Sequence, residues 1–166
     1  MGGLDIRAAE QQDLTSIAEI YAHYVTETVV TFDLDAPAVH DWRDKLTALT
    51  ALGWPFRVGV VDGVVLGYAY VAPWRVKPAY RLTLEDSVYV APDHIGQGYG
   101  RALLRDLLVE ARTAGARQLV AVIADAGTDT SVRLHRSLGF VDAGRLHGVG
   151  FKHGRWVDVT LMQASL

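Results

Sequence analysis

The chain has 166 residues, half of them hydrophobic, and a formal net charge of −3 at pH 7. This length fits a single domain, residues 1–166, with one sizeable core. A nucleic-acid-binding protein usually shows a basic excess, so the charge argues against a nucleic-acid partner. The sequence contains no cysteine, which excludes a disulfide framework and a thiol nucleophile.

The chain also lacks the sequence features of a secreted or membrane protein. Residues 1–13 carry charges and no apolar run, unlike a signal peptide. No apolar stretch reaches the roughly 20 residues that cross a bilayer. We therefore expect a cytoplasmic protein with no membrane partner. The six histidines show no tight ligand spacing, so we expect no metal.

Changes in hydrophobic period divide the first half of the chain into five elements. Asp13 is a candidate N-cap for a helix, and Asp62-Gly63 is a candidate tight turn between two strands. We expect strands at residues 4–8, 56–61 and 64–72, and helices at residues 14–28 and 35–53.

The second half of the chain is divided mainly by glycines. Gly115 follows a strongly amphipathic helix and Gly139 follows a shorter one. We expect strands at residues 82–91, 119–124, 140–148 and 156–162, and helices at residues 101–114 and 130–138. The complete order is β-α-α-β-β-β-α-β-α-β-β. It predicts a mixed sheet with helices on both faces, which is a three-layer α/β domain.

The most informative segment is a glycine-rich loop between a strand and a helix, residues 88–101. Gly96, Gly98 and Gly100 alternate with other residues, and glycine lets the backbone come close to a ligand. Consecutive amides can then point into one hollow, where the helix dipole adds positive potential. The segment therefore predicts a pyrophosphate site, although glycines at a strand–helix joint are also common for purely structural reasons.

Two familiar phosphate loops do not fit this segment. A dinucleotide-binding loop needs G-x-G-x-x-G in the first strand–helix unit, and a P-loop needs Gly-Lys followed by Ser or Thr. The mid-chain position and the spacing instead resemble the loop Q/R-x-x-G-x-G/A of GNAT acetyltransferases, matched at Gly98 and Gly100. Ile95 stands at the Arg or Gln position, which leaves more of the binding to the backbone.

Further motifs in chain order resemble the phosphinothricin and methionine sulfoximine acetyltransferase family within the GNAT enzymes. The segments that carry the resemblance are 20–25, 31–32, 72–75, Tyr80, 85–90, 131–135, 138–140 and 152–156. The resemblance implies a mixed, mostly antiparallel sheet of the GNAT type. It also implies acetyl-CoA as co-substrate, a small amino-acid-like substrate, and a homodimer.

The family's chemistry implies that the substrate amine attacks the acetyl thioester directly. The amine must first lose its proton, and Glu85 matches the family's general base. A carboxylate in a cleft floored by a sheet should have a raised pKa, which suits a base near neutral pH. His135 stands where many GNAT enzymes have a tyrosine that protonates the departing thiolate, and histidine can do the same at neutral pH. Asp86 alternates to the other face, and we expect it to have a structural role at most.

The resemblance also assigns binding residues. For the cofactor they are the backbone of Val88, Tyr89 and Val90, the loop residues Gly96, Gln97, Gly98, Tyr99, Gly100 and Arg101, and Thr128, which replaces a family asparagine. For the substrate they are Phe32, Trp74, Arg75, Val76, Lys77 and Tyr80. A cationic pair, Arg75 and Lys77, suits an α-carboxylate. The aromatic residues among them could equally be ordinary core.

Two other functions remain open from the sequence. A protein or peptide Nα-acetyltransferase shares the chemistry, but it needs an open groove in place of the 28–32 and 74–80 segments. A non-catalytic acetyl-CoA sensor is the second, which Glu85 argues against.

Overall fold

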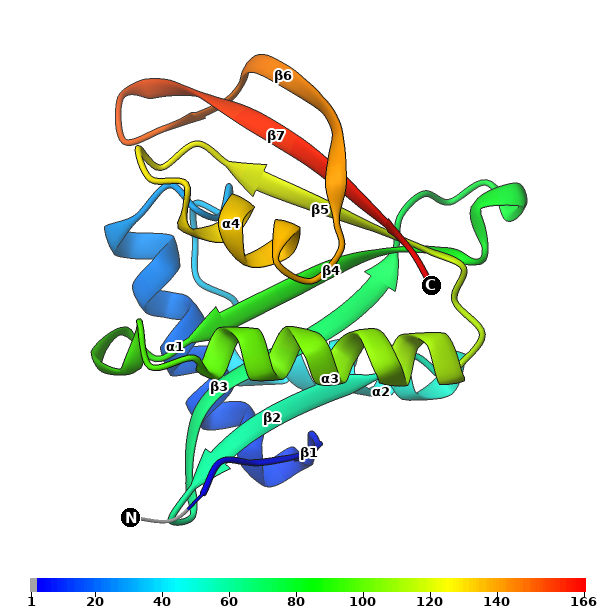
Figure 1. The fold of residues 1–166 in the computed structure, drawn as a ribbon. Coiled ribbons are helices and arrows are strands. Elements are labelled where there is room, and N and C mark those ends of the chain that lie inside the picture. Colours follow the sequence, from blue (N-terminus) through cyan, green and yellow to red (C-terminus); the bar gives the residue numbers. More distant parts are fainter. Residues whose placement is uncertain (1–2) are drawn as a thin grey trace.

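The computed structural model describes residues 3–166. A seven-stranded sheet runs through the domain, with helices on both sides (Figure 1). The strands are β1 (Asp5–Ala8), β2 (Phe56–Val61), β3 (Val64–Pro73), β4 (Thr83–Val90), β5 (Gln118–Ala124), β6 (Val141–Lys152) and β7 (Arg155–Ser165). The α-helices are α1 (Leu14–Glu27), α2 (Val39–Leu52), α3 (Tyr99–Thr113) and α4 (Thr130–Arg136).

The strand order in the sheet is β1-β2-β3-β4-β5-β7-β6. Every neighbouring pair is antiparallel except β4 and β5, which run parallel. A parallel pair needs a crossover connection, and α3 supplies it. The predicted mixed, mostly antiparallel sheet is confirmed.

Two hydrophobic clusters hold the helices on opposite faces of the sheet. Leu103, Leu104 and Leu107 bury the apolar stripe of α3 on one face, together with Phe140. On the other face, α1 and α2 pack through an aromatic-rich cluster that includes Trp42. Among the residues that the structure describes, no helix is long and apolar enough to cross a membrane.

The feature that positions the site is the parting of β4 from β5. These strands pair only at Thr83–Gln118, Leu84–Leu119 and Glu85–Val120. Beyond this point β4 continues along β3 as far as Val90, while β5 continues along β7 as far as Ala124. The two central strands therefore diverge in the middle of the sheet, with Glu85 at the last pair.

Several predicted boundaries were wrong by a few residues. The helix expected from residue 35 begins at Val39, where the Asp41 carboxylate accepts a hydrogen bond from the Ala38 amide at 2.8 Å. The helix expected from residue 101 begins at Tyr99. The last two strands are longer than expected, because β6 keeps its pairing through two register shifts that obscure its period.

The close crossing of α3 over β3 gives a stability prediction at Gly67. A Cβ there would lie 2.8 Å from the Tyr89 carbonyl oxygen and 3.0 Å from a Leu103 methyl. Gly67→Ala should therefore lower the free energy of unfolding by about 1–3 kcal/mol, the usual cost of overpacking. Gly3→Ala, where a Cβ meets nothing within 4 Å, is the matched control. Urea unfolding curves that coincide for the two variants would contradict this packing.

Candidate active site

The parting strands open a cleft of about 780 Å³. Its walls come mainly from α1 and the segment that follows it, the far half of β4, the glycine loop with the start of α3, and β5 with α4. Lys45 of α2, Tyr70 of β3 and Val159 of β7 complete the lining. Glu85 and Asp86 lie in the floor, and Gly96, Gly98 and Gly100 lie at the rim. One cleft therefore joins the predicted phosphate loop to the predicted base.

The glycine loop has the geometry that its sequence predicts. Gly96 and Gly98 have φ values of 82° and 87°, in the left-handed region, and a Cβ at either would meet nothing within 4 Å. Backbone conformation, and not crowding, therefore explains these glycines. Helix α3 begins directly after Gly98 and has no acidic residue in its first turn. Its unpaired amides and positive dipole end fit a pyrophosphate group.

The edge of β4 that faces the gap is a backbone surface. The Ala91 amide donates to the Leu66 carbonyl on the β3 side at 2.8 Å. Since hydrogen-bonding directions alternate along a strand, the polar groups of Val88 and Val90 point toward the gap. The Val90 carbonyl accepts a hydrogen bond from the Tyr24 hydroxyl at 2.5 Å. The backbone of Val88 is therefore the better candidate to pair with an extended ligand arm.

Glu85 is half-buried at the point where the strands part. Burial raises the pKa of its carboxyl group, the negative charge of Asp86 raises it further, and the positive charge of Arg75 acts in the opposite direction. The net direction is upward, which brings the carboxylate closer to the basicity that proton removal near neutral pH requires.

Asp86, on the opposite face of β4, forms a buried pair with His135 of α4. The Nε2 atom of His135 lies 2.9 Å from Asp86 Oδ2, and its Nδ1 atom lies 2.7 Å from the Ser131 carbonyl oxygen. Burial lowers the pKa of His135, but the hydrogen bond and charge of Asp86 outweigh it, so the net shift is upward. Both ring nitrogens then donate, as in a charged imidazolium.

The cleft contains side chains that the sequence reasoning missed. Tyr21, Tyr24 and Tyr70 line the α1 side, and Lys45 of α2 reaches it with its Nζ atom 3.0 Å from the Tyr70 hydroxyl. The tyrosines of α1 follow the helical period and read as core. Asp86 gave a clearer signal: an acid on the same face of β4 as Leu84 and Val88 needs a buried partner.

The predicted binding residues divide into two groups. The cleft is lined by Phe32, Val88, Tyr89, Val90, Gly96, Gly98, Tyr99, Gly100, Arg101 and Thr128, but not by Gln97. The cleft is also not lined by the predicted loop residues Trp74, Arg75, Val76, Lys77 and Tyr80. Their loop joins β3 to β4 at the ends of these strands that lie away from the glycine loop (Figure 1). Arg75 stacks on Trp74, 4.5 Å from the ring centroid, and its charge still acts on Glu85.

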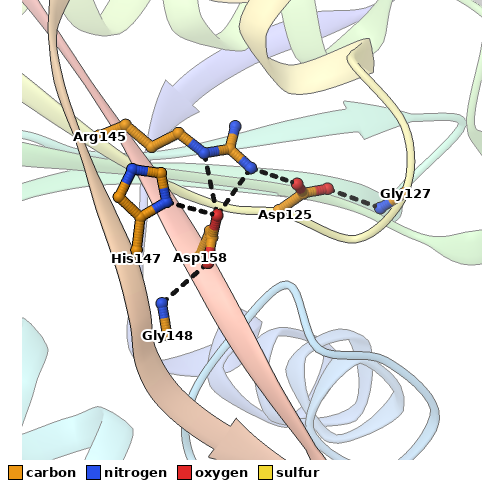
Figure 2. A network of polar contacts seen from close by, with 6 residues as sticks. All are labelled: Asp125, Gly127, Arg145, His147, Gly148 and Asp158. Carbon is orange, nitrogen blue, oxygen red and sulfur yellow. Dashed lines mark hydrogen bonds and ion pairs between the residues drawn. The ribbon is translucent and has the colours of Figure 1, made fainter.

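An ion network fixes the segment that carries Thr128. Figure 2 shows Arg145 of β6 between Asp125, at 2.7 Å, and Asp158 of β7, at 3.0 Å. Asp125 also accepts a hydrogen bond from the Gly127 amide at 3.0 Å. These donors hold the pKa of Asp125 below its ordinary value. The network ties the end of β5 to the C-terminal strands, just before the chain reaches Thr128.

Comparison with known proteins agrees with this geometry. The family model described as an acetyltransferase (GNAT) domain matches residues 6–161. The chain belongs to the GNAT acetyltransferases and is an N-acetyltransferase of that family.

Its relatives cover nearly the whole chain. It is 45% identical to the phosphinothricin N-acetyltransferase of Alcaligenes faecalis, over 97% of this chain and 82% of that protein. It is 41% identical to the L-methionine sulfoximine/L-methionine sulfone acetyltransferase of Salmonella typhimurium, over 98% and 95%. The structure of yncA from Salmonella typhimurium, solved with its cofactor acetyl-CoA, superposes with a TM-score of 0.96 at 40% identity, covering 99% of this chain and 94% of that one.

The Asp86–His135 pair predicts a pH-dependent stability. Because the pKa of His135 is raised by folding, its contribution is fully present below the unfolded value, about 6.5, and is lost as the pH rises through the folded value. His135→Ala should cost about 3–5 kcal/mol of unfolding free energy, since it leaves the Asp86 carboxylate buried without its partner. The difference from wild type should shrink as the pH is raised above about 6.5.

Urea unfolding between pH 6 and pH 9 measures this difference. The matched control is His40→Ala, because the His40 side chain is 72% exposed. A deficit for His135→Ala that stays constant over this pH range would contradict a charged His135 in the folded protein.

Proposed function

We propose that this chain transfers the acetyl group of acetyl-CoA to the amine of a small amino-acid-like substrate of the phosphinothricin or methionine sulfoximine type. The observation that carries the proposal is the place of Glu85, at the parting of β4 and β5, in one cleft with the glycine loop. The substrates named for the relatives support the substrate class.

The residues around the rim fit acetyl-CoA. We propose that backbone amides from Gly96 to Arg101 hold its pyrophosphate, that Val88 to Val90 pair with its pantetheine arm, and that Thr128 contacts it from the other wall. When bound, acetyl-CoA supplies the activated acetyl thioester. Backbone donors can polarise its carbonyl without any charged side chain. The loss of a side-chain contact at Ile95 leaves this backbone cradle as the main anion site.

We assign Glu85 as the general base. An α-ammonium group must lose a proton before its nitrogen can attack, and a half-buried carboxylate of raised pKa can accept that proton directly or through one water. The rest of the rate enhancement comes from holding the amine against the acetyl group.

We assign His135 to the departing thiolate, together with Asp86. His135 can release the Nε2 proton only if its hydrogen bond to Asp86 opens, which leaves a neutral imidazole still bonded to the Ser131 carbonyl. The buried Asp86 carboxylate then favours return of a proton to His135. The pair, and not the histidine alone, is therefore our proposed acid.

Cationic side chains are the proposed partners of the substrate's α-carboxylate. The charge of Arg75 reaches Glu85, and Lys77 follows in the same exposed loop. Lys45 is the lysine that lines the cleft itself. Phe32 is the proposed wall for the substrate side chain. Trp74, Val76 and Tyr80 do not line the cleft, and we propose that they border the part of the substrate that extends toward Arg75 and Lys77.

We further propose a homodimer in the cytoplasm, without a nucleic-acid partner. The net charge of −3 supports the absence of a nucleic-acid partner.

Exposed apolar side chains on the β6–β7 hairpin support a protein partner. The exposed fractions of Leu146, Val149, Phe151 and Trp156 are 45–68%. The centroids of the Phe151 and Trp156 rings lie 5.1 Å apart, so the rings form one apolar surface, and a second copy of this chain is our proposed partner for it. Analytical ultracentrifugation tests this assignment: wild type should sediment as a dimer and Trp156→Glu as a monomer.

The Glu85 assignment predicts a pH-dependent catalytic loss. Glu85→Gln keeps the shape of the side chain but removes its basicity. We expect kcat/KM with methionine sulfoximine to fall by roughly 100-fold at pH 7, about 3 kcal/mol. The loss should shrink as the pH rises, because more of the amine is then neutral without a base. Thiol release from acetyl-CoA measures the rate.

The acetyl-CoA Kd, measured by calorimetry, should stay unchanged in Glu85→Gln and serves as the control. Wild-type activity of this variant at pH 7 would refute the base assignment. The same assay over amino acids, simple amines and short peptides separates the alternatives: preferred peptides would indicate an Nα-acetyltransferase, and no turnover a sensor.

A further inference from the structure

We infer that the β6–β7 hairpin positions Phe32 through Gly150, and that Gly150 thereby determines which substrate side chains the cleft accepts. This inference rests on the proposed function, because it assumes that Phe32 lies against the substrate. Neither Gly150 nor its hairpin neighbours Lys152 and His153 line the cleft. They are therefore positioning residues and not catalytic ones.

The segment from Val30 to Asp33 forms one wall of the cleft, and all four of its residues line it. Within the segment, the Tyr21 hydroxyl lies 2.6 Å from both Thr31 Oγ1 and Asp33 Oδ2. This bond pair ties the segment to α1. Neither hydrogen bond involves Phe32, which is 38% exposed, so they do not hold its ring in place.

The hairpin supplies the restraint from the other side. The buried Lys152 side chain donates from Nζ to the Thr31 carbonyl oxygen at 2.8 Å. His153, in the turn, lies 3.2 Å from the Thr28 carbonyl oxygen through its Nε2 atom. The Thr31 carbonyl group of the cleft wall and the Thr28 carbonyl group just before this wall are therefore held by residues some 120 positions away in the sequence.

Gly150 provides the space into which Phe32 fits. A Cβ at Gly150 would overlap the Phe32 ring, whose Cζ and Cε2 atoms are the nearest heavy atoms to it. The φ angle of Gly150 does not lie in the left-handed region. An alanine can adopt this backbone, so the constraint on position 150 is the ring and not the conformation. The absence of a side chain at Gly150 thus allows the Phe32 ring to pack against the hairpin, and this packing sets the position of the ring in the cleft wall.

Gly150→Ala should displace the ring from the hairpin and alter the cleft wall. We expect the KM for methionine sulfoximine to rise about tenfold, within the range for a change of one methyl group in a pocket. The kcat and the acetyl-CoA Kd should stay within about twofold of wild type, because the reacting groups and the cofactor residues are untouched.

A double-variant cycle supplies the matched control. Phe32→Ala removes the ring atoms that an alanine at 150 would meet, so Gly150→Ala should cause no further rise in KM in that background. If Gly150→Ala leaves KM unchanged, or raises it equally in both backgrounds, the inference is wrong. Lys152→Met, which removes the bond to Thr31 but keeps an unbranched side chain only one atom shorter, should also raise KM more than it lowers kcat.

Amide hydrogen exchange provides a readout that does not need turnover. Residues 28–33 should exchange faster in Gly150→Ala than in wild type, and at the same rate in Phe32→Ala with and without Gly150→Ala. Unchanged exchange in Gly150→Ala would overturn the inference whatever the substrate is. Faster exchange in an enzyme that acetylates no amino acid would instead place the failure in the proposed function.

Discussion

The site depends on the divergence of two parallel strands in the middle of the sheet. After Glu85 and Val120 the backbone groups of β4 and β5 no longer pair with each other, although both strands stay paired on their outer sides. Polar backbone groups inside a protein need partners. The Tyr24 hydroxyl supplies one for Val90, and an extended amide-containing ligand can supply others. The gap therefore acts as a binding surface because it is an interrupted sheet.

The charged residues follow from the same geometry. Because side chains alternate along β4, the adjacent acids Glu85 and Asp86 point to opposite faces at the place where the strands part. Glu85 remains half-buried on the aromatic side and makes no ion pair with residues 3–166, and burial raises its pKa. Asp86 is buried on the α4 side, where His135 neutralises it. One strand thus provides an available base on one face and a fixed ion pair on the other.

Much of the fold and the cofactor loop could be predicted from the sequence. Periodicity and turn residues located every strand and α-helix among residues 3–166, but not the short 3-10 helices. Gly96 and Gly98 adopt the positive φ angles that a backbone cradle needs. The start of α2 was wrong because Asp35 and Pro37 resemble a helix start, whereas the Asp41 side chain caps the helix at Ala38. Pairings between distant segments leave no local pattern, so neither Asp86 with His135 nor Lys152 with Thr31 could be predicted.

The position of the 74–80 loop relative to the cleft could not be predicted from the sequence either. Its cationic and aromatic residues favour a binding role, but the loop joins the ends of β3 and β4 that lie away from the glycine loop. Sequence pattern indicated what these side chains could bind, and only the topology shows which part of the molecule they face.

The central claim is that the gap between β4 and β5 receives acetyl-CoA. A crystal structure of the protein with acetyl-CoA tests it most directly. The account predicts the pyrophosphate at the amides of residues 96–101, the extended arm along Val88 between the parted strands, and the acetyl group near Glu85. Acetyl-CoA bound outside this gap, or a complex in which β4 and β5 pair along their whole length, would contradict it.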